Sequence, residues 1–237
     1  MFRADIDGKT LTCDLNGLIG SNFVMRDRQT GSDWQQATGE AIAGPMKGKR
    51  LTMVPFLLTT WGEWRAQHRE TLALVPEPRY QAKYQMMAQR VRNLLRSRTP
   101  RDAPLRDDPR LPPHEQVLGL ETGGGHKAYP LALLEKQTVL NDQVGSTPVL
   151  VIHAAASNTT TAFSRILRGR TLTFHAASPG AVEVMDRETG SKWTPYGECI
   201  AGKLKGEKLD PITPLPSFWF SWAEFFPETE VFAAAAN

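Results

Sequence analysis

His153 and Ser157 come nearest, by type and spacing, to a nucleophile with its general base. They stand four positions apart, directly after the apolar run that ends at Ile152. A histidine activates a serine hydroxyl only when the two side chains are in hydrogen-bond contact. A separation of four in an extended stretch does not ensure that contact, and the Gly-x-Ser-x-Gly turn of the α/β-hydrolases is absent. Both remain catalytic candidates, for a hydrolase that would use the 153–160 loop.

The same loop and a few matched positions supply candidates for ligand binding. Loops at strand ends commonly carry binding groups, which favours Asn158. Paired aromatic and acidic side chains recur along the chain and are candidates as well. The binding candidates are therefore Asn158, His175, Trp193, Glu198, Trp34 and Glu40. The recurrence of Trp34 as Trp193, and of Trp61 as Trp219, is explained more simply by core packing.

Two histidines, His153 and His175, are candidate metal ligands. His153 and His175 would bind a metal ion if neighbouring strands brought them together, with Cys199 or Glu198 as a further ligand. No His-x-x-x-His spacing occurs, and histidines on strands more often make structural hydrogen bonds. We predict neither a metal ion nor a cofactor.

Cysteine content and apolar patterning exclude several classes of protein. The 237 residues include two cysteines, Cys13 and Cys199, too few for a disulfide framework or a four-thiolate zinc site. Both align with apolar residues in the internal repeat described below, which predicts that they are small buried side chains. No apolar run has the length of about 20 residues that a membrane-spanning helix needs, and no N-terminal stretch resembles a signal peptide. The sequence predicts a globular chain without a membrane span.

The net charge of +3 has a local origin. Residues 76–115 hold nine basic and five acidic residues, so this segment contributes +4 and the remainder −1. Apolar residues at steps of three and four predict a helix over 78–97, and dense prolines predict an extended linker over 99–113. We considered nucleic acid or acidic lipid as a partner of its arginines. Since aromatic residues are not interleaved on the basic face, we favour a solvated helix face and no nucleic acid.

An internal repeat organises the chain. Residues 24–34 recur at 184–193, residues 39–44 recur at 197–202, and shorter matches flank both. We predict a first repeat unit over 1–75, a basic helix and proline-rich linker over 76–115, and a second repeat unit over 116–237.

Each repeat unit is predicted to be rich in β-structure. Alternating residues predict strands at 10–13, 22–25 and 171–174, a hairpin over 117–129 and a buried strand at 148–152, while the three glycines at 123–125 indicate a turn. Capping-box spacing predicts short helices after Thr60 and after Ser221, and another helix spans 131–136. The fold class is therefore α+β, predominantly antiparallel β, in two copies of one β-rich unit with short helices and one longer linker helix.

The two copies differ in extent. Met1 aligns with Ala162, so residues 117–161 have no counterpart in the first copy, which we therefore expect to be N-terminally incomplete. Strand edges left uncovered predict a protein partner or self-association through the N-terminal strand edge. If the recorded start lies inside a longer gene, a signal segment could precede it, so localisation stays open and includes an extracytoplasmic site.

Several of these segments resemble a known family. The segments are Asp27–Ser32 with Trp34, Gly39–Pro45, Thr59–Trp61 with Glu63–Arg65, Val117–Gly119 with Lys127–Leu131, Asn141-Asp142 with Val144-Gly145, and Pro148–Val151. They resemble the domain of unknown function 3179 family of bacterial and archaeal proteins, some of which are selenoproteins.

The resemblance implies a redox site that this chain lacks. After the strand matching Pro148–Val151, members typically carry a Cys-Pro-Leu-Cys-like motif, sometimes with selenocysteine. Here the two cysteine positions match Ala154 and Ser157. We therefore favour a non-catalytic scaffold, or a binding or assembly module with a degenerate thiol site. The alternative is an enzyme, either a thiol or selenol oxidoreductase with its motif upstream of Met1 or the hydrolase named above.

Overall fold

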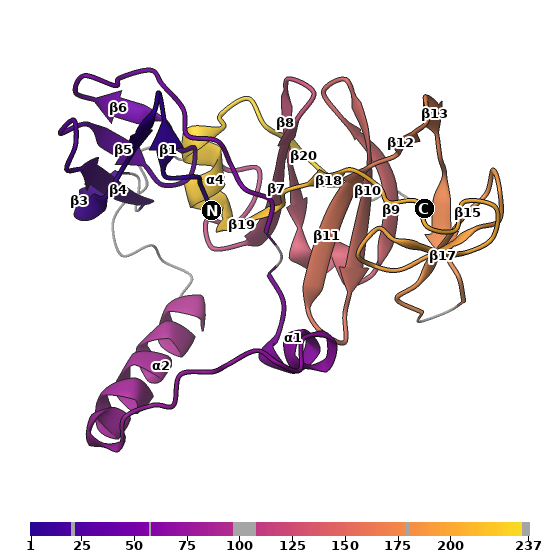
Figure 1. Ribbon diagram of the computed structural model, residues 1–237, viewed down its shortest axis with the longest axis horizontal. Coiled ribbons are helices and arrows are strands. Elements are labelled where there is room, and N and C mark those ends of the chain that lie inside the picture. Colours follow the sequence, from indigo (N-terminus) through magenta and orange to yellow (C-terminus); the bar gives the residue numbers. More distant parts are fainter. Residues whose placement is uncertain (20–21, 57, 97–107, 179–180, 234–237) are drawn as a thin grey trace.

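Antiparallel β-sheets dominate the protein. The computed structural model describes residues 1–19, 22–56, 58–96, 108–178 and 181–233 (Figure 1). Its helices are short except for one, so the predicted α+β, β-rich class is confirmed. Among the described residues, no helix combines the length and the apolar character needed to cross a membrane.

The N-terminal part forms a hairpin and a four-stranded sheet. The hairpin pairs β1 (Asp5–Ile6) with β2 (Lys9–Thr10), and its turn holds Gly8 at φ +72°, in the left-handed region that glycine tolerates. The N-terminal sheet has the strand order β3 (Cys13–Ile19), β4 (Asn22–Asp27), β5 (Asp33–Gln35), β6 (Ala41–Ala43). Strand β3 is therefore one edge of this sheet.

Two helices follow the N-terminal sheet. Helix α1 (Trp61–Gln67) begins as predicted, because Thr60 Oγ1 accepts a hydrogen bond from the Glu63 backbone N–H at 3.3 Å. The predicted basic helix comprises a 3₁₀ turn, η1 (Pro78–Tyr80), and α2 (Gln81–Arg96). The part of the predicted linker over 97–107 lies outside the described residues, and residues 108–113 contain neither helix nor strand.

Two four-stranded sheets form the middle of the molecule (Figure 1). The first has the order β19 (Leu215–Phe218), β7 (Gln116–Thr122), β8 (Gly125–Pro130), β20 (Glu230–Val231). The second has the order β18 (Pro211–Ile212), β11 (Thr159–Ser164), β10 (Thr147–Ala154), β9 (Val139–Val144). The predicted hairpin is the β7–β8 pair, and the predicted buried strand is β10.

The side chains of β10 point alternately to the two faces of its sheet, and both faces are buried. Val149 and Val151 pack with Leu118 and Leu120 of β7 in one core cluster. Leu150 and Ile152 point the other way, into a second cluster that includes Phe174, Val184 and Trp193. Helix α3 (Leu131–Leu134) follows β8, and α4 (Trp219–Phe225) packs against β7.

The second core cluster belongs to a sheet near the C-terminal end of the chain. This C-terminal sheet has the order β14 (Phe174–Ala176), β15 (Val184–Asp186), β16 (Lys192–Trp193), β17 (Cys199–Ala201). A hairpin of β12 (Ile166–Leu167) and β13 (Arg170–Thr171) precedes it, as β1 and β2 precede the N-terminal sheet. The segments that match in sequence thus have the same strand order, while the division into two repeat units and a linker stays a prediction.

The aligned segments also share a side-chain network. Asp27 accepts hydrogen bonds from Thr30 Oγ1 at 2.6 Å and from Trp34 Nε1 at 2.8 Å. Asp186 accepts them from Thr189 Oγ1 at 2.8 Å and from Trp193 Nε1 at 2.9 Å. The Asp-Thr-Ser-Trp pattern in both segments is thereby explained as a folding element, with each aspartate buried beneath a turn.

Five local predictions are wrong. The strands predicted at 10–13 and 171–174 are each interrupted, because residues 11–12 and 172–173 lie between two strands and belong to neither. Cys13 is exposed, whereas Cys199 is buried as predicted, because Cys13 lies on an edge strand that no other element covers in the part of the chain that the structure describes. Trp61 is 50% exposed although its match Trp219 is 1% exposed, because α4 packs against β7 and α1 has no equivalent sheet beneath it among the described residues. Helix α4 begins at Trp219, before the predicted Ser221, with Phe218 as a cap that makes no side-chain hydrogen bond.

Candidate functional site

The end of the β10–β11 pair holds His153, one of the two catalytic candidates. His153 is 3% exposed and lies opposite Thr160, and its Nδ1 and Thr160 Oγ1 are hydrogen-bonded at 2.8 Å. Burial lowers the pKa of His153 below its ordinary value, and Glu135 opposes this weakly because its negative charge favours the imidazolium. The neutral ring is therefore the favoured form in the folded protein.

Ser157 lies in the tight turn that follows β10. Its hydroxyl donates to the Ala154 carbonyl at 3.4 Å, and Asn158 next to it has φ +48°. Among the described residues, no hydrogen bond joins Ser157 to His153. The loop brings the two candidates near each other along the chain without forming a base–nucleophile pair.

Next to this turn lies a side-chain hydrogen bond that the sequence did not predict. Thr59, just before α1, has its hydroxyl 2.8 Å from that of Thr159 on β11. Nearby, Tyr196 donates its hydroxyl hydrogen to Glu63 of α1 at 2.7 Å and accepts one from Gln67. Burial and the hydrogen bond to Glu63 raise the pKa of Tyr196. Since these partners are 100 or more residues apart, no local spacing in the sequence could have indicated them.

A small cavity lies beside Thr160, the residue after Thr159. It has a volume of about 230 Å³ and is lined by Phe56, Thr160, Thr161, Tyr196 and residues of β18. This volume lies below the range of about 300–1,000 Å³ typical of sites for drug-sized ligands. The cavity therefore suits a fragment-sized molecule at most.

The remaining binding candidates do not converge on this site. Trp34 and Trp193 are fully buried, each donating to its aspartate. Glu198 pairs with Lys208 at 2.5 Å on the surface, and Glu40 lies in a β-bridge opposite Arg50.

The two candidate metal ligands differ in their surroundings. His175 is exposed and lies opposite Met185 on β15, whereas His153 is buried on β10. Within the described ranges, no group of three or more His, Cys, Asp or Glu side chains is arranged to hold a metal ion.

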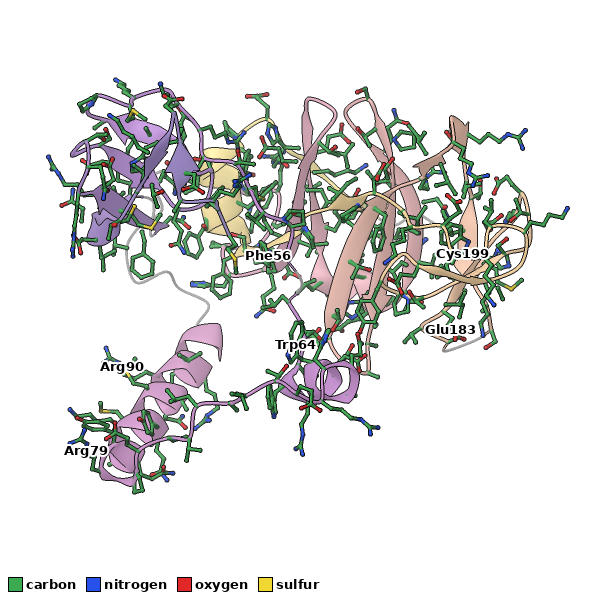
Figure 2. The ribbon with its side chains drawn as sticks, viewed as in Figure 1. Phe56, Trp64, Arg79, Arg90, Glu183 and Cys199 are labelled. Carbon is green, nitrogen blue, oxygen red and sulfur yellow. The ribbon has the colours of Figure 1, made fainter. Side chains whose placement is uncertain are left out.

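A larger cavity lies between the N-terminal part and α4. Its volume is about 560 Å³, and its walls include Phe2, Met25 and Phe56 on one side and Leu215, Trp222 and Phe225 on the other. Figure 2 labels Phe56 below and to the right of α4, beside the central sheets. The hydrogen bond from Asn22 Nδ2 to Ser221 Oγ, 2.6 Å long, joins the two walls.

An ion pair also fixes the N-terminal part against β7. Arg50 contacts Glu121 through two hydrogen bonds of 2.6 and 2.7 Å. Burial alone would raise the pKa of Glu121, but Arg50 outweighs it and the pKa is lowered. The bidentate geometry adds orientation as well as attraction to this contact.

The edge strands of the two matched sheets, β14 and β3, differ in the contacts that cover them. At β14, Asn141 of β9 donates its Nδ2 to the Phe174 carbonyl and accepts from the Phe174 N–H through Oδ1, both at 2.7 Å. Cys13 aligns with Phe174, and no described side chain makes the corresponding pair of hydrogen bonds with its backbone. All seven residues of β3 are exposed, including Leu15 at 66% and Leu18 at 57%.

The fold and these surfaces define a β-rich α+β protein. Its N-terminal and C-terminal sheets have the same strand order, and its β3 edge is apolar and exposed. The chain belongs to the family described as protein of unknown function DUF3179, whose model matches residues 1–229. Comparison with curated proteins finds no match, and comparison with solved structures finds none either.

Proposed function

We propose that the protein is a non-catalytic assembly module that pairs with a second copy of itself through β3. One observation carries this proposal: among the described residues, no side chain covers the β3 edge as Asn141 covers the matching edge at β14. An uncovered strand edge presents unpaired N–H and C=O groups on which another strand can add.

The side chains of β3 favour a protein partner. Leu15, Leu18 and Ile19 of β3 and Phe23 of β4 are all 42% or more exposed, which gives the edge an apolar surface. Antiparallel pairing of two β3 strands would place identical edges against each other, as a two-fold symmetric dimer requires. A second copy therefore supplies both the backbone partners and matching apolar side chains.

The candidate catalytic loop supports a non-catalytic role. The positions where the family resemblance implies thiols hold Ala154, at the end of β10, and Ser157, whose hydroxyl is bonded to a backbone carbonyl. His153 directs its Nδ1 to Thr160. Neither arrangement supplies an activated nucleophile.

The oligomeric state tests the proposal. Analytical ultracentrifugation of the full chain is expected to show a dimer whose dissociation follows dilution. The double variant Leu15→Lys/Leu18→Lys is expected to be monomeric, because two lysines facing their copies on an edge strand repel and resist dehydration. Far-ultraviolet circular dichroism and urea unfolding check that the variant remains folded.

Leu58→Lys is the matched control, because Leu58 is 60% exposed and lies outside the N-terminal sheet. It is expected to leave the dimer intact. A monomeric wild-type chain, or a dimer that survives the double β3 substitution, would overturn the proposal.

The 560 Å³ cavity supports ligand binding as a second candidate function. Its volume falls within the range typical of small-molecule sites, and its walls are mainly apolar with a few polar groups. An apolar dye such as anilinonaphthalene sulfonate is expected to bind and to change the fluorescence of Trp222. Ala37→Trp, on the cavity wall, should prevent binding, whereas Ala82→Trp on exposed α2 should not. Equal dye binding by both variants would exclude this cavity as the site.

A further inference from the structure

Helix α2 carries an apolar stripe that nothing in the described structure covers. Its residues 81–93 are all exposed, with Tyr84 at 43%, Met87 at 52% and Val91 at 50%. Figure 1 shows the helix standing apart from the sheets, and Figure 2 shows Arg79 and Arg90 at this outlying position. The side-chain hydrogen bonds of α2, from Gln89 to Asn93 and from Arg92 to Gln89, stay within the helix.

The stripe has cations along both borders. With 3.6 residues per turn, Tyr84, Met87 and Val91 share one face of α2. Lys83 and Arg90 lie along one border of this face, and Arg92 lies along the other. The opposite face carries Gln85 and Gln89, and Gln81 lies on the border beside Arg92.

The charge of this region has a single sign. Residues 78–101 contain seven Lys or Arg and no Asp or Glu, so this segment carries only positive charge. Glu77, just before it, pairs with Arg79 at 2.5 Å and leaves the cations of α2 itself without a carboxylate partner among the described residues. Tyr80, one turn before Tyr84, lies within cation–π distance of Arg79 at 4.7 Å and of Lys83 at 5.3 Å. The N-terminal end therefore combines tyrosine rings with cationic groups.

This arrangement matches the surface of an anionic bilayer. A helix that lies in the bilayer interface inserts its apolar stripe at the boundary of headgroups and acyl chains, while flanking Lys and Arg extend to the lipid phosphates. Tyrosine rings are favoured at the same depth. A nucleic acid would engage the cations but leave Tyr84, Met87 and Val91 in water.

We infer that α2 is an interfacial anchor that binds the protein to the surface of an anionic phospholipid membrane. Tyr84, Met87 and Val91 face the acyl chains, and Lys83, Arg90 and Arg92 contact phosphate groups. The inference does not depend on β3 pairing, since α2 and β3 are separate surfaces.

Vesicle co-sedimentation of the full chain tests the inference. The protein is expected to sediment with vesicles of mixed phosphatidylglycerol and phosphatidylcholine, and to remain in the supernatant with phosphatidylcholine alone. Binding should weaken as salt is raised, because the lipid charge is screened. Failure to bind the mixed vesicles would overturn the inference, as would stronger binding to a single-stranded oligonucleotide at the same salt concentration.

Two adjacent methionines give a matched pair of variants. Met87 lies on the stripe and Met86 on the far side of the helix, and they are 52% and 53% exposed. Met87→Gln is expected to weaken vesicle binding by about tenfold, whereas Met86→Gln should leave it nearly unchanged. Both variants keep the charge and the exposed position, so equal effects would show that charge alone drives binding and would refute insertion of the stripe.

A charge variant completes the design. Lys83→Gln/Arg90→Gln is expected to reduce binding to the mixed vesicles by at least about tenfold, since each basic group near an anionic surface contributes to affinity. The urea midpoint of every α2 variant should equal that of the wild type, because these side chains are exposed and contact no core residue among those the structure describes. Unchanged binding by the charge variant would contradict the role assigned to the cations.

Discussion

The indole Nε1 of Trp34 donates a hydrogen bond to Oδ2 of Asp27 across 2.8 Å, in the interior of the N-terminal sheet. Asp27 is 1% exposed and Trp34 is fully buried. Burial alone would raise the pKa of Asp27, but hydrogen bonds from Thr30, Trp34 and Ser32 outweigh it and lower the pKa. The carboxylate thus stays charged and connects the turn to the core.

Removing this carboxylate is expected to destabilise the protein. Asp27→Ala leaves the Trp34 Nε1 and the hydroxyl of Thr30 without their acceptor, and we expect the free energy of unfolding to fall by about 3 kcal/mol. Asp186→Ala should have an effect of similar size, because Trp193 and Thr189 make the same contacts there. Urea unfolding followed by tryptophan fluorescence measures both.

Asp14→Ala is the control for these two variants. Asp14 pairs with Arg28 at the surface, where both side chains are more than half exposed, so its removal should change stability little. If Asp27→Ala were no more destabilising than Asp14→Ala, the aspartate network would not be a folding element.

His153 predicts a specific dependence of stability on pH. Its pKa in the folded protein is lowered by burial, so the unfolded chain takes up a proton first as pH falls below the ordinary value near 6.5. The His153 contribution to the free energy of unfolding is therefore full above about pH 6.5. It is lost as pH falls toward the folded-state pKa.

Urea unfolding between about pH 8 and about pH 5 tests this dependence. His153→Gln removes the titration, so its stability should decline less steeply over this range than that of the wild type. His175→Gln, at an exposed position, should keep the wild-type slope. Identical slopes for His153→Gln and the wild type would show that His153 does not resist protonation in the folded state.

The elements were largely predictable because local patterns determine them. The glycines at 123–125 and the alternating residues on either side specify the β7–β8 hairpin, and the Thr60–Glu63 spacing specifies the start of α1. The prediction for Cys13 failed for a tertiary reason. Alternation shows that a residue is on a strand, but only the neighbouring elements decide whether that strand is covered.

The candidate site was less predictable than the fold. His153 and Thr160 were both within the predicted loop, and antiparallel pairing explains why they meet. The contacts of Thr59 with Thr159 and of Glu63 with Tyr196 join segments far apart in the chain. They depend on how the N-terminal part packs against the central sheets, which no spacing in one sequence encodes.

Replacing a glycine by alanine is expected to change the free energy of unfolding in opposite directions at two places, one beside α4 and one within α1. A Cβ at Gly119 on β7 would lie 2.1 Å from the ring of Trp222, which is 2% exposed, so the ring or the strand would have to shift. Gly119→Ala is therefore expected to lower the free energy of unfolding by about 2 kcal/mol or more. At Gly62 on α1 a Cβ would meet no atom within 4 Å, and Gly62→Ala should raise it by about 1 kcal/mol through helix propensity.

A double-mutant cycle separates the Gly119–Trp222 contact from other effects. Trp222→Leu is destabilising by itself because it removes buried surface, but it also makes room beside β7. Gly119→Ala should therefore cost less in the Trp222→Leu background than in the wild type, and urea unfolding of the four proteins gives the coupling free energy. An equal cost in both backgrounds would mean that the glycine is required for a reason other than the close approach of Trp222, and that α4 is not held against β7 by this contact.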